Sequence, residues 1–209
     1  MRNKQWLLIG FLGLFMGLYL PPLQAQNKRE YKKRVCEHRE EYKRDFLKDE
    51  RSPFYNKEDQ LKALRFFKPN RDWRITCRFE LTPNEKPFEL PTYSGITKPY
   101  IKYGLLHFEI DGQSHSLAVY RNMRMVNLPG FNTYLFLPFK DFTNGESTYG
   151  GGRYIDLKTT DIKDGQVVID FNKCYNPWCA YSDGYNCPIP PQENHLAIEV
   201  KAGEKVYKK

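Results

Sequence analysis

Three cysteines lie close together near the end of the chain, in the segment CYNPWCAYSDGYNCPIPP (174–191). Thiols at this spacing suit a disulfide, a zinc site completed by His195, or a cysteine nucleophile. The zinc spacing, C-x4-C-x7-C-x7-H, is loose and contains no C-x2-C pair. A nucleophile needs a histidine beside a partly exposed thiolate, and the sequence positions none of the four histidines there. We therefore predict no metal ion and no cofactor.

A second candidate site is the turn TYGGGRYIDL (148–157), in which three glycines precede an arginine. The N–H groups of Gly151 and Gly152 could cradle an anion, and Arg153 could hold a carboxylate or phosphate with two parallel hydrogen bonds. A P-loop is excluded, because no lysine-serine/threonine pair follows and the next residues read as a strand. The alternative is a tight or bulged turn in which Arg153 pairs with Asp156 or Asp170.

Four carboxylates form a third candidate: Asp141, Asp156, Asp170 and Glu193. Two carboxylates that face one cleft could act as an acid/base pair in glycoside hydrolysis, with aromatic residues as a sugar platform. The alternative is that Asp156 and Asp170 serve turns and ion pairs near strand ends. The spacing of the four does not show that they converge.

The chain begins with a short basic segment, an apolar run of about 15 residues (6–20) and a small residue, Ala25. This order is typical of a secretory signal peptide, and two prolines end the run before it reaches the length of a membrane span. We predict a signal peptide over residues 1–25 and export to the periplasm or the extracellular space. We predict no stable membrane insertion after the signal is removed.

The formal net charge is +8, and loss of Arg2 and Lys4 with the signal leaves +6 on the remaining chain. A basic chain can bind anionic partners, but much of the excess lies in one N-terminal segment that also carries many acids. No RNP-like, zinc-finger or helix-turn-helix pattern occurs, so we predict no nucleic-acid partner. No motif predicts the oligomeric state.

Two helices are predicted within residues 28–68. The first carries an apolar-aromatic stripe at helical spacing, and its members are Tyr31, Val35, His38, Tyr42 and Phe46. The second is capped by Asn56 and ends before Pro69; its apolar face is Leu61, Leu64 and Phe67.

From residue 72 the apolar period changes to two, which predicts strands. Asp111-Gly112 and Asp164-Gly165 predict two-residue hairpin turns, since glycine accepts the positive φ of such turns. If 154–157 and 166–171 pair across the second turn, Arg153 and Asn172 lie at the same end of the hairpin.

These elements predict an α+β fold, with the two N-terminal helices packed on a largely antiparallel β-sheet or sandwich. The helical lead spans residues 28–68 and the β-rich body residues 72–209, within one domain over residues 26–209. The loops 141–156 and 170–195 are expected to converge.

The stretches LPFKDFTNGESTYGGGRYIDL (137–157) and IDFNKCYNPWCAYSDGYNCPIPPQENHLAIEVKAGEK (169–205) resemble the DUF1684 family of bacterial proteins. The resemblance extends more loosely to DWRITCRFEL and FELPTYSG, and so from about residue 45 to 205. The family's name records an unknown function. The resemblance implies a signature of Arg153, Tyr154, Asp156, Asp170, Asn172, Tyr175, Asn176, Pro177, Cys179, Cys187, Pro188, Glu193 and Asn194. It also implies that Cys174 stands where a small residue is expected.

For the cysteines, the leading interpretation is a disulfide between Cys179 and Cys187. The loop it would close is short, Gly184 and Pro188 let it bend, and chain entropy gives a stabilisation of roughly 2–3 kcal/mol. Pairing of either residue with Cys174 is the rival. Because the chain has five cysteines, at least one has no partner within it.

We predict a binding module for a small anionic or polar ligand at the 150–156 and 170–195 loops. Its expected ligand-binding residues are Gly151, Gly152, Arg153, Tyr154, Asp170, Asn172, Tyr175, Asn176 and Glu193. One alternative is a hydrolytic enzyme that uses Asp170, Glu193 or Cys179 in the same cleft, and another is a structural envelope protein. Arg153 separates these alternatives: an open cleft around it favours binding, and burial with full pairing favours structure alone.

Overall fold

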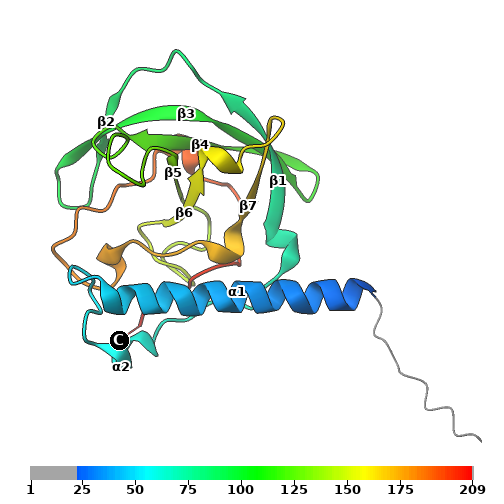
Figure 1. Ribbon diagram of the computed structural model, residues 1–209, viewed down its shortest axis with the longest axis vertical. Helices are drawn as coiled ribbons and strands as arrows, with labels where there is room; N and C mark the ends of the chain where they lie inside the picture. Colours follow the sequence, from blue (N-terminus) through cyan, green and yellow to red (C-terminus); the bar gives the residue numbers. More distant parts are fainter. Residues whose placement is uncertain (1–22, 209) are drawn as a thin grey trace, which may run out of the picture.

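The computed structural model describes residues 23–208 of the chain and consists of one long helix and a curved antiparallel sheet. Helix α1 (Leu23–Lys48) lies across one side of the sheet (Figure 1). The predicted signal peptide before residue 23 lies outside the described residues. Among the described helices, none has the length and apolar character of a membrane span.

Seven strands form the sheet, and every pairing between them is antiparallel. They are β1 (Arg74–Leu81), β2 (Phe88–Pro91), β3 (Thr97–Ile110), β4 (Gln113–Asn122), β5 (Tyr134–Phe139), β6 (Arg153–Lys158) and β7 (Gln166–Asp170). Their order is β6-β5-β4-β3-β1-β7, with β2 paired to β3. The sheet curves into a half-barrel, and its two end strands, β6 and β7, lie above α1 in Figure 1.

Of the two predicted N-terminal helices, only the first forms over several turns. Its stripe is buried at Tyr31, Val35 and Phe46, as helical spacing requires. The second prediction corresponds to a single turn, α2 (Glu58–Leu61). The start of this turn lacks the predicted cap: Asn56 takes a left-handed φ of 56°, and the residue after it provides no side-chain cap.

The interior of the half-barrel is filled by the inward-facing side of the strands, with Cys77, Leu117, Leu137 and Ile169 almost completely buried. The alternation read from the sequence of β1 is confirmed at Cys77, which points into this core. The fold is therefore an antiparallel half-barrel with one long N-terminal helix.

Both predicted two-residue turns are present. Asp111 and Gly112 have positive φ and join β3 to β4, where Ile110 pairs with Gln113. Asp164 and Gly165 also have positive φ.

The second turn does not pair β6 with β7, so the predicted pairing of 154–157 with 166–171 is wrong. β6 pairs with β5, and β7 pairs with β1. The reason lies in the link between them, where the short helix η2 (Thr159–Asp161) interrupts the extended chain after Lys158. The Lys158 N–H donates to the Asp161 carboxylate at 2.8 Å, and the Thr159 N–H donates to the Thr133 carbonyl at 2.8 Å.

The two signature segments nevertheless meet by another route. Tyr154 and Tyr175 exchange two backbone hydrogen bonds, of 2.9 and 3.0 Å. The start of β6 and the cysteine-rich segment therefore lie side by side, through this bridge instead of a hairpin.

Candidate functional site

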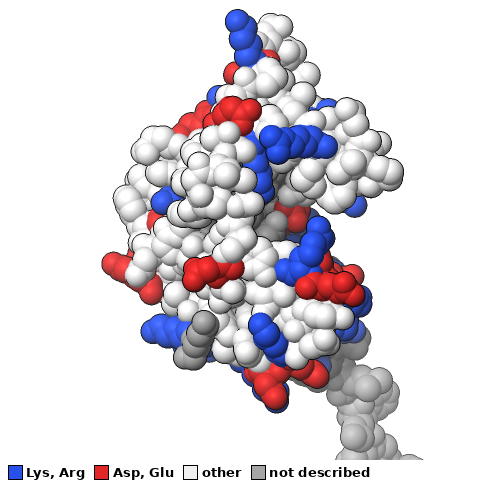
Figure 2. Space-filling view, turned by 90° about the vertical axis from the view of Figure 1, so that its left-hand side faces the viewer, with Lys and Arg blue, Asp and Glu red and all other residues white. Residues whose placement is uncertain are grey.

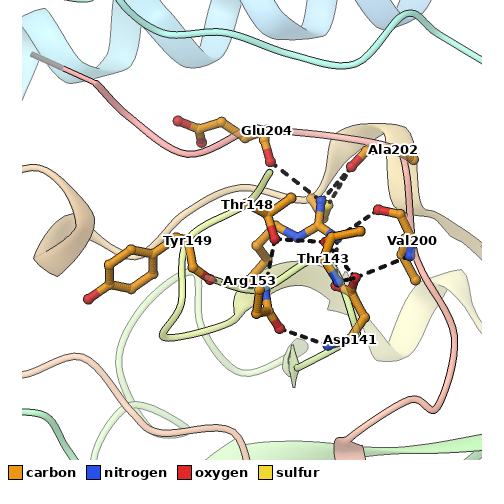
Figure 3. A network of polar contacts seen from close by, with 10 residues as sticks. Asp141, Thr143, Thr148, Tyr149, Arg153, Val200, Ala202 and Glu204 are labelled. Carbon is orange, nitrogen blue, oxygen red and sulfur yellow. Dashed lines mark hydrogen bonds and ion pairs between the residues drawn. The ribbon is translucent and has the colours of Figure 1, made fainter. Parts of the chain in front are cut away.

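Arg153 is completely buried at the start of β6, and its guanidinium bonds only to protein oxygens (Figure 3). It donates to the Asp141 carboxylate at 2.7 Å and to the carbonyl oxygens of Val200 at 2.9 Å and Ala202 at 2.5 Å. The Asp141 side chain is equally buried. This Arg153 cluster fixes the C-terminal segment to the sheet, and no Arg153 donor faces solvent.

The expected partners of Arg153, Asp156 and Asp170, are not the ones it has. Side chains alternate along a strand, so Arg153 points to the interior with Ile155, whereas Asp156 points to the opposite face. Asp141 therefore takes the place that the sequence interpretation gave to the other two aspartates.

The neighbouring glycines are required by close packing. Gly152 has a φ of 92°, and a Cβ on it would lie 2.6 Å from the Phe139 carbonyl oxygen. Its N–H donates to the Tyr149 carbonyl at 3.1 Å, and the Gly151 carbonyl accepts from the Tyr93 hydroxyl at 2.8 Å. Both glycines are buried, so an anion cradle here would need this packing to open.

Three more residues of the predicted ligand set are buried and engaged with the protein. The Asn172 amide nitrogen donates to the Tyr31 hydroxyl and the Asn70 carbonyl, at 2.8 and 2.7 Å. The Asn176 amide nitrogen donates to the Lys205 carbonyl at 2.8 Å. The Tyr154 hydroxyl donates to the Pro188 carbonyl.

Sequence analysis did not single out Glu204, which is a completely buried carboxyl group. It accepts hydrogen bonds from the hydroxyls of Tyr181 and Tyr42, at 2.7 and 3.1 Å, and from the Asn176 N–H at 2.9 Å. Burial without a cationic partner raises the pKa of Glu204 to about 7. No local signal marks this residue, because its segment reads as a charged tail.

A pocket of about 1040 Å³ opens between α1 and the end strands β6 and β7. Of the four carboxylates considered from the sequence, Asp156 and Asp170 line it. Tyr175, from the predicted ligand set, lines it as well. Glu193 does not line this pocket; it accepts from Lys102 at 2.7 Å and from the Tyr120 hydroxyl at 2.6 Å.

Asp156 lines this pocket and is held by two tyrosines. The hydroxyls of Tyr134 and Tyr175 both donate to its Oδ1 atom, at 2.8 and 2.7 Å. Surrounding protein desolvates the carboxylate and raises its pKa, and the two hydrogen bonds offset part of that rise. The side chain is still open to solvent through the pocket, and Oδ2 has no hydrogen-bond partner among the described residues.

Asp170, at the end of β7, differs from Asp156 in that both its carboxylate oxygens accept hydrogen bonds. Its two oxygens accept from the Tyr31 hydroxyl at 3.0 and 3.1 Å, and Oδ1 also accepts the backbone and side-chain N–H groups of Asn172. His38 of α1 lies at the same side, where burial and the neighbouring charge of Lys173 lower its pKa. This lowering of the pKa favours the neutral form of His38.

Acidic side chains outnumber basic ones around the pocket, although the whole chain is basic. The acids are Glu41, Asp45, Asp49, Asp156, Asp161 and Asp170, and the bases are Lys48, Arg74, Lys163 and Lys173. Tyr42 and Trp178 add aromatic surface.

The predicted disulfide between Cys179 and Cys187 is confirmed. Its formation uses both thiols, so neither residue can ligate zinc or attack a substrate in this state. Cys174 is buried and unpaired, and burial raises the pKa of its thiol to about 11.

Comparison with known proteins finds a solved structure with a similar fold and a matching family. The chain is similar to an uncharacterized protein of Haloarcula marismortui whose structure was solved by NMR in solution, with a TM-score of 0.63 and 32% identity. The similarity covers 86% of this chain and 96% of that one. No curated protein matches. The family described as "Protein of unknown function (DUF1684)" matches residues 59–205. The chain therefore belongs to the DUF1684 family.

Proposed function

We propose that this protein binds a small polar ligand in the pocket between α1, β6 and β7, with Asp156 as the main contact. The observation that carries the proposal is the state of Asp156. Two tyrosines hold one of its oxygens, while the other has no hydrogen-bond partner within residues 23–208. A carboxylate that is fixed in orientation and still reachable is suited to recognise a hydroxyl, amide or ammonium group.

The sequence predicted a small anionic or polar ligand. The proposal here retains a polar ligand and replaces the anionic one by a neutral or cationic one. The six acids and four bases of the pocket favour a neutral or cationic ligand over an anion. Arg153 is fully buried and both its terminal nitrogens bond to protein oxygens, so none of its donors reaches the pocket or the solvent. This burial supports a structural role for Arg153. On the face drawn in Figure 2, acidic and basic side chains are interspersed.

A hydrolytic enzyme is the second candidate, and one observation favours it. Asp156 and Asp170 line the same pocket, and the raised pKa of Asp156 suits a general acid. Of the residues named for this alternative, Cys179 is in a disulfide and Glu193 lies outside the pocket. A hydrolase would therefore depend on the two aspartates.

We also propose that the protein works outside the cytoplasm, after removal of residues 1–25. The disulfide between Cys179 and Cys187 supports this location, because such bonds persist in oxidising compartments.

The test is a thermal-shift screen of residues 26–209 against neutral sugars, amino acids, polyamines and short peptides. Binding should raise the melting temperature, by mass action on the folded state. Asp156→Asn should abolish the shift, whereas Glu193→Gln, which changes a carboxylate outside the pocket, should retain it. Equal shifts in both variants, or none with any compound, would contradict the proposal.

A further inference from the structure

We infer that the ligand of this pocket is an extended, positively charged peptide whose backbone pairs with the free edges of β6 and β7. The inference rests on the proposed function and names the class of ligand. It starts from the two end strands of the sheet, which do not pair with each other as they would in a closed barrel.

The direction of the backbone groups of β6 follows from Tyr154. Both its N–H and its carbonyl bond to Tyr175, so they point away from β5. Backbone direction repeats every second residue along a strand. The N–H and carbonyl of Asp156 therefore also point away from β5, toward the pocket that Asp156 lines.

The same reasoning applies to β7. The Phe79 N–H of β1 donates to the Gly165 carbonyl at 2.8 Å, whereas Gln166 exchanges two bonds of 2.8 Å with Lys163 on the other side. Gln166 thus points away from β1, and so does Val168 two residues later. Val168 lines the pocket as well.

Asp156 and Val168 thus direct free backbone groups into one pocket from two sides. Among the described residues, no hydrogen bond outside the strand ladders involves these backbone groups. Edges of this kind bind extended peptides by adding a strand. The volume of about 1040 Å³ lies just above the roughly 300–1,000 Å³ usual for small-molecule pockets, which favours a ligand of several residues.

Charge selects the side chains of that peptide. The excess of acids in the lining attracts lysine or arginine, and the free Oδ2 of Asp156 can accept from either. Tyr42 and Trp178 also line the pocket and add aromatic surface that can attract a cationic side chain.

The probe is a pooled library of acetylated, amidated tetrapeptides, each with at least one lysine, added to ¹⁵N-labelled protein. Binding should move the amide proton signals of Asp156 and Val168 downfield and slow their exchange with solvent. N-methylation of the peptide amide that pairs with an edge should weaken binding about tenfold, because one hydrogen bond is lost and the strands are pushed apart.

Variants of one residue give a matched control. Val168→Pro removes the free edge donor without touching the ladder to β1, and it should weaken peptide binding about tenfold. Val168→Ala keeps the donor and should weaken binding less than Val168→Pro, and Glu193→Gln, outside the pocket, should bind like the wild type. If the proline variant does not fold, the N-methylated peptides test strand pairing from the other side, because they remove a peptide N–H that donates to an edge carbonyl.

Two failures are distinguishable. If no pool binds while a non-peptide compound gives an Asp156-dependent thermal shift, the peptide inference is wrong and the proposed function stands. If nothing binds in either assay, both are wrong. Peptides that bind with unchanged affinity after N-methylation at every position would exclude strand pairing.

Discussion

Arg153 and Asp156 lie three residues apart on the same strand, and both were expected to belong to one site. Arg153 faces the interior, where its two terminal nitrogens donate to Asp141 and to two carbonyls. Asp156 faces the pocket, where two tyrosines hold one oxygen and no other residue of the described chain bonds to the second. Charged residues of one signature can therefore have opposite roles, and the free hydrogen-bonding capacity that remains distinguishes them.

Glu204 gives a second contrast with the Arg153 cluster. Arg153 and Asp141 neutralise each other in the interior. Glu204 has only neutral donors around it, so the proton itself neutralises the buried carboxylate at low pH. The two buried sites should consequently respond differently to substitution and to pH.

The largest effect is expected for Arg153→Met. The change leaves the Asp141 carboxylate buried and unpaired, which should reduce the free energy of unfolding by about 3–5 kcal/mol. Urea denaturation followed by tryptophan fluorescence measures it. The double variant Arg153→Met/Asp141→Leu removes both charges and should recover part of the loss. A loss below about 1 kcal/mol in the single variant would show that the ion pair does not stabilise the fold.

The pH dependence of stability should follow Glu204. Its pKa is about 7 in the folded state and near 4.5 when unfolded, so between these values the folded state binds more protons. Stability therefore falls as pH rises from 4.5 through 7, by up to about 3 kcal/mol at 1.36 kcal/mol per pKa unit. Denaturation of wild type and Glu204→Gln at pH 5 and pH 8 measures the difference.

Glu204→Gln should lose most of this slope. Asp156, whose pKa is also raised, contributes in the same direction and leaves a smaller residual slope in the variant. Parallel pH profiles for the two proteins would show that Glu204 titrates as an ordinary exposed carboxylate.

Loss of the disulfide should have the next largest effect. The bond closes a short loop with a sequence separation of 8, for which chain entropy gives about 2–3 kcal/mol. Cys187→Ser should reduce the free energy of unfolding by that amount, whereas Cys36→Ser, at an exposed free cysteine, should change it little. Non-reducing mass spectrometry of the wild type provides the direct check, and a Cys174 bridge there would overturn the assignment.

Sequence analysis predicted the features whose cause is local. The stripe of α1, the alternation of β1, both glycine turns and the short disulfide loop depend on residues close to one another in the chain.

The predictions that were wrong or missing concern contacts between residues far apart in the chain. A turn at Asp164-Gly165 does not determine which strands pair beyond it, and Arg153 could not be placed inside without knowing which face of β6 is buried. Glu204 meets Tyr42 across 162 residues, and no local pattern reports such a contact.

The smallest effect on stability is expected for Asp156→Asn. Asparagine keeps the shape of the side chain and an oxygen that can accept from Tyr134 and Tyr175, so stability at pH 7 should change by less than about 1 kcal/mol. Urea denaturation measures it beside Arg153→Met. Ligand binding should be lost in Asp156→Asn while the fold persists, because the carboxylate faces the pocket. A loss of stability comparable to that of Arg153→Met would instead make Asp156 a second structural determinant, and the contrast along β6 would disappear.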